Sequence, residues 1–254
     1  MADENVRRHW ADNRLLAALS AGDCALLEPH AQLVHLGRGQ VLFEPEDDVV
    51  ITHFPLTGMM AALVIVFEDG RTAEAATIGR EGAIGGIVSG GHKPAFARAV
   101  TEIAGAALRI ETARIEIAKE RSAPVRELFA RYADALLAQI LQSVTCNAVH
   151  SIQQRFARWL LMTSDQIGSA ELPLTQQTMG EMLGVHRTGV MRVAHLLQSQ
   201  GLIRYGRGRL TIVDRQGLEQ SACECYHAVA VYSRKMASKS KPEAKSRRRR
   251  NPQD

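Results

Sequence analysis

The stretch from Thr175 to Arg192 constrains this chain more than any other, because it predicts two short helices joined by a tight turn. In the first helix Met179, Met182 and Leu183 recur every three to four residues and form one apolar stripe. Gly184 follows where the chain must turn, and glycine adopts a positive φ without a side-chain clash. The pattern therefore predicts a helical hairpin with one buried face.

The second predicted helix opens with small and basic residues and then becomes apolar at Val190, Val193, Leu196 and Leu197. This is the layout of a helix-turn-helix, whose second helix lies in the major groove of DNA. Arg187 and Arg192 are the leading base-contact candidates, because arginine pairs bidentately with guanine. The full predicted set is His186, Arg187, Thr188, Gly189 and Arg192. The alternative is an ordinary hairpin with solvated arginines.

The next segment, residues 201–213, predicts a basic β-hairpin. Two β-rich runs flank Gly206-Arg207-Gly208, which is a hairpin signature. A basic hairpin after a recognition helix is a wing, and its arginines would contact phosphates without reading bases. The predicted phosphate contacts are Thr175, Gln176, Arg204, Arg207 and Arg209, with Thr175 also capping the first helix. Alternatively, the arginines only solubilise the hairpin.

The N-terminal half predicts a short helical region over Asn13 to Leu27 and then short strands. The expected strands cover residues 33–36, 40–43, 49–54, 59–67, 72–78 and 98–110. Asp69-Gly70 between two of them is a hairpin signal. Short strands at this spacing favour a jelly roll or barrel.

A long helix is predicted from Pro124 to about His150, because the stretch has few helix breakers. One near-heptad series of side chains predicts a parallel two-helix dimer interface. Its predicted members are Phe129, Tyr132, Leu136, Ile140, Ser143 and Asn147. The alternative is a helix packed on its own domain. A further helix should follow, with Ser151 as its cap.

This order of elements resembles the Crp-Fnr superfamily of bacterial transcription regulators. Residues 183–192 fall on the family's recognition-helix pattern, and the match is strongest over residues 174–213. The resemblance implies that the N-terminal half is the cyclic-nucleotide-binding β-roll. Arg187 and Arg192 stand at the arginine positions of the cyclic-AMP receptor, but Thr188 replaces a glutamate that accepts from cytosine. The half-site should therefore differ. Residues 146–151 and 222–226 resemble a branch common in α-proteobacteria.

In nucleotide-binding members a Gly-Glu pair holds the ribose and a later arginine neutralises the phosphate. Here Gly86 stands at the glutamate position and Phe96 at or near the arginine position. The phosphate would lose a charge-assisted pair, so cyclic AMP is not expected. Two readings stay open, a vestigial pocket and a site for an unknown small effector. The candidate pocket residues are Gly85, Gly86, Phe96 and Arg98.

The four cysteines stand at positions 24, 146, 223 and 225. Fnr-type members hold an iron–sulfur cluster on several N-terminal cysteines, and only Cys24 is available there. Cys223-Glu224-Cys225 with His227 nearby could bind a metal or respond to oxidation, but two thiols do not complete a zinc site. We expect bystander thiols, no metal and no cofactor. Haem ligation by His30, His35 or His53 stays open.

Charge is distributed unevenly along the chain. Residues 1–150 carry a net charge of −5, residues 151–233 carry +2 and residues 234–254 carry +7, consistent with the total of +4. The basic C-terminal portion favours DNA. The last segment should be disordered and either adds phosphate contacts or is a soluble extension. Without a membrane-length apolar run or a signal region, the chain is expected to be cytoplasmic, with no membrane partner.

We therefore predict an α+β chain whose jelly-roll domain spans residues 1–121. The dimerisation helix covers 122–150, the winged helix-turn-helix domain 151–233 and the disordered basic tail 234–254. The predicted function is a homodimeric regulator that reads a palindrome in double-stranded DNA, with RNA polymerase as a further partner if it activates transcription. An enzyme is not expected, since the common catalytic motifs are missing. The alternatives are a nucleoid-type protein and a small-molecule-binding module without a DNA role.

Overall fold

The computed structural model describes residues 4–86 and 90–237. Three short helices open the chain: α1 (Glu4–Trp10), α2 (Arg14–Ala17) and α3 (Ala21–Leu27), followed by a 3-10 turn at Glu28–His30. The side chains of Asn13 and Ser20 cap α2 and α3 by accepting backbone N–H groups. The one predicted helical region is therefore two helices separated by a cap, and α1 was not predicted.

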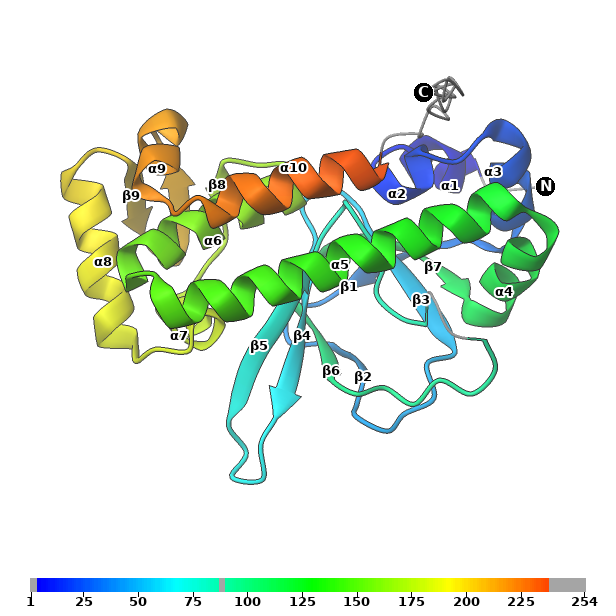
Figure 1. Cartoon of the computed structure of the whole chain (residues 1–254), viewed down its shortest axis with the longest axis horizontal. Coiled ribbons are helices and arrows are strands. Elements are labelled where there is room, and N and C mark those ends of the chain that lie inside the picture. The colour runs from blue at the N-terminus through cyan, green and yellow to red at the C-terminus, as the bar shows by residue number, and fades with distance from the viewer. Residues whose placement is uncertain (1–3, 87–89, 238–254) are drawn as a thin grey trace, which may run out of the picture.

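Two antiparallel sheets form the predicted β-roll (Figure 1). One has the order β1-β7-β3 and the other β2-β6-β4-β5. The strands are β1 (Gln32–Leu36), β2 (Val41–Phe43), β3 (Ile51–Pro55), β4 (Met60–Val66), β5 (Thr72–Ile78), β6 (Arg98–Ile103) and β7 (Gly105–Glu111).

The single strand predicted over residues 98–110 is wrong, because the chain breaks at Ala104 into β6 and β7. These strands belong to different sheets, so the break is where the chain changes sheet. Gly105 permits the crossing, since a Cβ there would lie 2.8 Å from the Cβ of Met59. A sequence run with uniform β character does not reveal such a corner.

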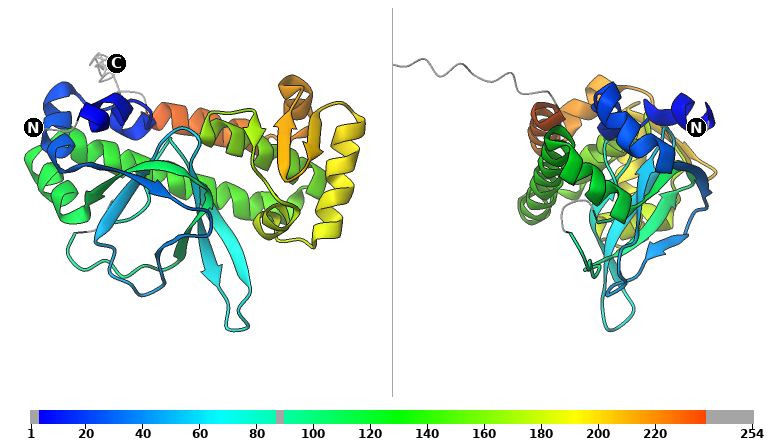
Figure 2. Two further views of the ribbon diagram at one scale, coloured as in Figure 1. Left: turned by 180° about the vertical axis from the view of Figure 1, so that it is seen from behind. Right: turned by 90° about the vertical axis from the view of Figure 1, so that its right-hand side faces the viewer.

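After α4 (Thr112–Arg121), the long helix α5 (Ala123–Val149) crosses the whole molecule (Figure 1). Ser122 caps it, and Pro124 occupies its first turn, where no N–H partner is needed. The predicted long helix is therefore confirmed. The unpredicted helix α10 (Cys225–Ala237) packs along it in the opposite direction, and Figure 2 shows the pair at one edge of the molecule. Residues 234–237 are thus helical and not disordered; residues 238–254 lie outside the described part.

The C-terminal domain begins with α6 (Ile152–Ile167), which carries a complete capping box between Ser151 and Gln154. It continues through β8 (Glu171–Leu172), α7 (Gln176–Leu183), α8 (Arg187–Ser199), β9 (Ile203–Gly206), β10 (Arg209–Ile212) and α9 (Arg215–Ser221). The three strands form one small antiparallel sheet.

One hydrophobic core joins this domain to the roll. Met60 and Ile103 from the roll belong to the same buried cluster as Trp159 and Leu160 of α6. Hydrogen bonds reinforce the contact, including one from the Gln166 side-chain amide to the Thr77 carbonyl at 2.8 Å. The two domains are therefore held together by both apolar burial and polar pairing.

Candidate nucleic-acid interface

The helix-turn-helix is built as its residue pattern predicts. The Thr175 hydroxyl accepts the backbone N–H of Thr178 at 3.2 Å, which confirms the cap of α7. Gly184 adopts the left-handed conformation with φ of +62°. Gly180 allows the two helices to meet, because a Cβ there would lie 3.0 Å from the Val185 carbonyl.

Helix α8 presents one polar face and buries the other. Its buried residues are Val190, Val193, Ala194 and Leu197. Leu196, which we predicted on the apolar face, is 42 % exposed and lies toward the rim. His186, Arg187, Thr188 and Arg192 are all exposed, while Gly189 is half-buried. The His186 Nδ1 lies 3.1 Å from the Thr188 hydroxyl, so these two side chains fix each other at the start of the helix.

The basic hairpin is confirmed as β9 and β10, with Arg209 paired to Gly206. Arg207 and Gly208 form its turn with φ of +52° and +74°, the pattern of the tight turns that suit twisted strands. The side chains of Arg204, Arg207 and Arg209 are exposed. Figure 1 shows this hairpin at the same end of the molecule as α8, so the predicted base and phosphate contacts share one end.

Sequence reasoning missed Arg38, which lies in the turn between β1 and β2. Its guanidinium donates to the Thr175 hydroxyl at 3.2 Å and also to the Thr178 hydroxyl. It lines a hollow of about 690 Å³ together with Gln176 and Arg187. The roll therefore adds a cation to the start of α7, a long-range contact that no local motif could signal.

The predicted effector residues do not converge on one cavity. Phe96 is 88 % exposed, so it does not line a pocket and that prediction is wrong. The stem of Lys93 fills the space beside Gly86, where an added Cβ would lie 2.3 Å from the lysine Cδ. Arg98 pairs with Glu44 at 2.7 Å, and Gly85 turns with φ of +120°.

A cavity of about 560 Å³ lies elsewhere, between the N-terminal helices, α5, α6 and α10. Its polar lining includes Arg14, Glu81, Tyr132, Gln166 and Arg215. Burial raises the pKa of the Glu81 carboxyl, whose Oε2 has no hydrogen-bond partner among the described residues.

The predicted dimer series is wrong at Phe129 and Tyr132, because both are buried in their own chain. The Phe129 ring packs edge-on against Phe54 with centroids 6.3 Å apart, and the Tyr132 hydroxyl donates to the Ala83 carbonyl at 3.1 Å. Of the remaining predicted members, Leu136, Ile140 and Ser143 are half-buried and Asn147 is exposed.

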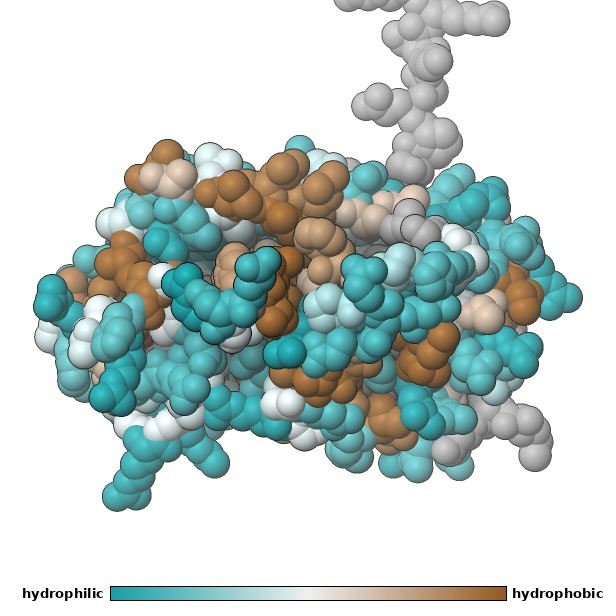
Figure 3. Space-filling model, turned by 90° about the horizontal axis from the view of Figure 1, so that it is seen from below, coloured by the Kyte–Doolittle hydropathy of each residue, from teal (hydrophilic) through white to brown (hydrophobic). Residues whose placement is uncertain are grey.

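A neighbouring series on α5 is exposed instead. Leu137, Leu141 and Val144 are 55 %, 59 % and 65 % exposed. They continue in both directions at alternating spacings of four and three, which is the heptad pattern. We call this series the exposed seam: Ala130, Asp134, Leu137, Leu141, Val144 and Ala148. Figure 3 shows hydrophobic side chains gathered along the upper edge of the view, the side on which α5 runs.

Three of the four cysteines come together, which sequence reasoning did not predict. Cys146 in the last turn of α5 meets Cys223, just before α10, and Cys225, the first residue of α10, and His150 completes the group. His227, the residue considered from the sequence, lies beside Tyr226 instead, with the two rings tilted by 58°. The spacing of Cys146 and His150, one helical turn apart, was the available local signal.

A comparison with known protein families gives a match within the C-terminal domain. Residues 154–221 match the Crp-like helix-turn-helix domain. No curated protein matches the chain. Within the described residues no helix has the length and apolar character needed to cross a membrane.

Solved structures share the arrangement of the chain. FixK2 from Bradyrhizobium japonicum is 16 % identical with a TM-score of 0.66, over 76 % of this chain and 98 % of FixK2. A putative Crp/Fnr-family regulator from Eubacterium rectale is 20 % identical with a TM-score of 0.59, over 85 % and 98 %. CLP from Xanthomonas campestris, a c-di-GMP-responsive global regulator, is 16 % identical with a TM-score of 0.60, over 76 % and 99 %.

Proposed function

We propose that this chain, which has the fold of the Crp/Fnr regulators and carries a Crp-like helix-turn-helix, is a homodimeric transcription regulator that reads a palindromic DNA site. The observation that carries the proposal is the exposed polar face of α8 beside the arginines of the β9–β10 hairpin. A recognition helix and a basic wing at one end of a domain fit the major groove and the adjacent backbone.

In the proposed complex, the first turns of α8 read the bases. Arg187 and Arg192 lie on the exposed face and would pair with guanines, with His186 and Thr188 beside them. Gly189 lets the helix approach the base edges closely. Arg204, Arg207 and Arg209 of the wing, with Thr175 and Gln176 at the start of α7, would hold phosphates.

The exposed seam supplies the proposed dimer contact. Helices that pair through a heptad seam bury the apolar a and d positions of both copies. A two-fold axis through this seam would present two α8 helices to half-sites about one helical turn apart, so the site would be a palindrome. Because such a regulator works on the chromosome, we place it in the bacterial cytoplasm.

Substitution of one recognition arginine tests the assignment. Arg187→Ala should weaken binding to the preferred duplex by about 1–3 kcal/mol and relax the preference at one base pair of each half-site. Equilibrium binding to the preferred duplex and to its single-base variants would measure both effects. Unchanged selectivity in Arg187→Ala would refute the assignment, and a uniform loss on all duplexes would favour a nucleoid-type protein.

A further inference from the structure

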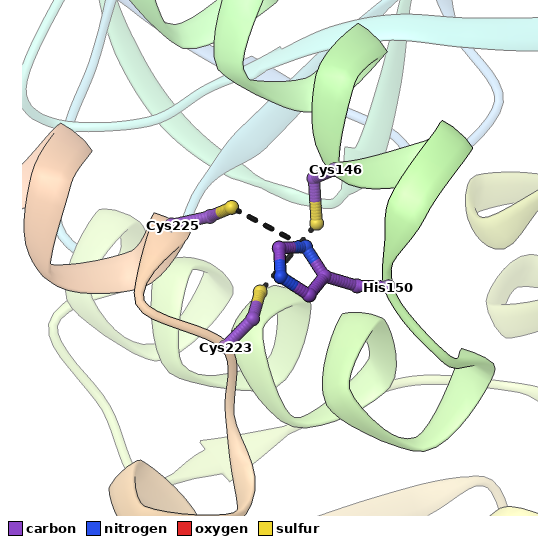
Figure 4. Close-up of side chains that lie close together, drawn as sticks. All are labelled: Cys146, His150, Cys223 and Cys225. Atoms are coloured by element: carbon purple, nitrogen blue, oxygen red, sulfur yellow. Dashed lines mark hydrogen bonds between the residues drawn. The ribbon is translucent and has the colours of Figure 1, made fainter.

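A group of four metal-binding side chains, which we call the cysteine–histidine cluster, joins the end of α5 to the start of α10. Its members are Cys146, His150, Cys223 and Cys225, and one ligand atom from each lies within 4.8 Å of all the others. Figure 4 shows the four side chains pointing toward one another. The three thiols are buried, with exposures of 0 %, 3 % and 1 %.

Two distances within the cluster are close to the edges of a tetrahedral site. With a zinc–sulfur bond of about 2.3 Å and a zinc–nitrogen bond of about 2.0 Å, the edges of the tetrahedron are about 3.8 Å between sulfurs and about 3.5 Å between sulfur and nitrogen. The sulfurs of Cys146 and Cys223 lie 3.5 Å apart. The sulfur of Cys225 lies 3.6 Å from the Nδ1 of His150.

The groups around the cluster are arranged as metal sites require. His150 turns Nδ1 toward the thiols, and its Nε2 lies 3.3 Å from a Glu224 carboxylate oxygen. Carboxylates in this position orient ligating histidines and fix the tautomer. The side-chain amide of Gln142 donates to the sulfur of Cys225 at 3.0 Å, a contact that would stabilise a thiolate.

The local backbone also fixes two of the ligands. His150 is the C-cap of α5, and its N–H donates to the Cys146 carbonyl at 3.0 Å. Cys225 is the first residue of α10, and Cys223 lies in the turn before it. The ligands therefore come from two helix ends that pack antiparallel, and only the folded chain brings them together.

We propose that the cysteine–histidine cluster is a structural Zn²⁺ site that fastens α10 to the end of α5. A Cys₃His set is a complete tetrahedral ligand shell, so the ion would have no open position for substrate. Binding would form three zinc–sulfur bonds and one zinc–nitrogen bond and release one proton from each of the three thiols to solvent. A multi-iron cluster fits poorly, because its ligands spread around several irons and these converge on one point.

This site would act where the dimer helix meets the DNA-binding domain. Helix α5 carries the exposed seam, and α6 of the DNA-binding domain starts at Ile152, just after His150. A metal bond across this junction would hold the orientation of α8 relative to the seam. That consequence rests on the proposed function, whereas the metal site itself does not.

Metal content of the untagged full-length protein, purified under reducing conditions, is the direct test. We expect one zinc per chain, and Co²⁺ substitution should give thiolate charge-transfer bands with tetrahedral visible bands. Cys223→Ser should lose the metal and both sets of bands. Cys24→Ser is the matched control, since Cys24 lies outside the cluster, and it should keep the metal in full.

Two further variants separate ligation from folding. His150→Cys replaces the imidazole with a fourth thiolate, so it should still bind Co²⁺ but with a stronger charge-transfer band. Glu224→Ala should fold normally and weaken zinc binding about 10- to 100-fold, as loss of an outer partner does. Circular dichroism would verify the fold of each variant.

Three results would overturn the proposal. One is a folded wild-type chain that takes up no zinc or Co²⁺ under reducing conditions. Another is Cys223→Ser that binds as much metal as wild type. The third is wild-type protein that is made with zinc available yet is metal-free and carries a Cys146–Cys223 disulfide, which would make the pair a redox switch. None of these readouts uses DNA, so failure here is distinct from failure of the proposed function.

Discussion

At the scale of single residues, the element that carries an arginine decides whether its side chain can contact bases or phosphates in the proposed DNA complex. Arg187 lies at the start of a helix that can enter a groove, whereas Arg204 lies on a strand of the wing. A charge on a strand beside the duplex neutralises phosphate but does not reach base edges. Substitution of these two arginines should therefore affect DNA binding in different ways.

Arg204→Ala should weaken binding to all duplexes by a similar factor, and the slope of log affinity against log salt should fall by about 1. Titrations at several salt concentrations, with preferred and scrambled duplexes, would measure both quantities. Arg187→Ala is the comparison. A change of base preference in Arg204→Ala would contradict a phosphate role.

The buried His53 makes the stability of the folded protein depend on pH. Burial, with a smaller contribution from Arg109, lowers the pKa of His53 from 6.5 to about 4. Above pH 6.5 both folded and unfolded His53 are neutral. As pH falls from 6.5 toward 4, the unfolded chain takes up a proton that the folded chain refuses, so stability is lost across this window.

His53→Gln should therefore lose less stability than wild type between pH 6.5 and 4, and the difference should be on the order of 3 kcal/mol. Urea unfolding at a series of pH values would measure it. Burial raises the pKa of Glu74 to about 8, so this carboxyl lowers the stability of the folded protein as pH rises. Its contribution is the same in wild type and in His53→Gln. Identical pH profiles would contradict the assignment.

At the scale of elements, the exposed seam of α5 can be tested by a single substitution. Leu141→Asp puts a charge at a position that dimerisation should bury, so the chain should become monomeric and lose affinity for a palindrome. Val50→Asp is a matched control, because Val50 is 62 % exposed and lies outside both α5 and the C-terminal domain. Sedimentation at several concentrations would distinguish them, and a dimeric Leu141→Asp would contradict the seam.

Elements with local signals could be predicted from the sequence, and those with long-range causes could not. The caps at Thr175 and Ser151 and the turn at Gly184 depend on neighbouring residues, and all three are present. The near-heptad series predicted on α5 includes the buried Phe129 and Tyr132, because two adjacent series on this helix satisfy such a spacing. Which series is free depends on the roll, since Phe54 covers Phe129.

The site shows the same division. The wing turn at Arg207 and Gly208 could be predicted from the residues of the turn itself, and the structure confirms it. Arg38 reaches the start of α7 across 137 residues of sequence, and Cys146 meets Cys223 across 77. The break of the long predicted strand at Ala104 likewise depends on how the two sheets close.

At the scale of the whole molecule, the long helix α5 links the proposed dimer contact to the domain that carries α8. Its seam would set the two-fold axis, and the domain that follows it carries α8. Because roll and DNA-binding domain share one core, a change in the roll can be transmitted to α8 through packed side chains. The proposed function therefore requires a dimer whose two α8 helices bind one DNA site together.

Selection of bound sequences from a random duplex pool, with the purified chain at near-physiological salt, tests this claim most directly. A dimer paired through the exposed seam should select a palindromic consensus with half-sites about one helical turn apart, and Leu141→Asp should lose that symmetry. Enrichment of a single unpaired half-site by wild type, or equal retention of all sequences, would contradict it.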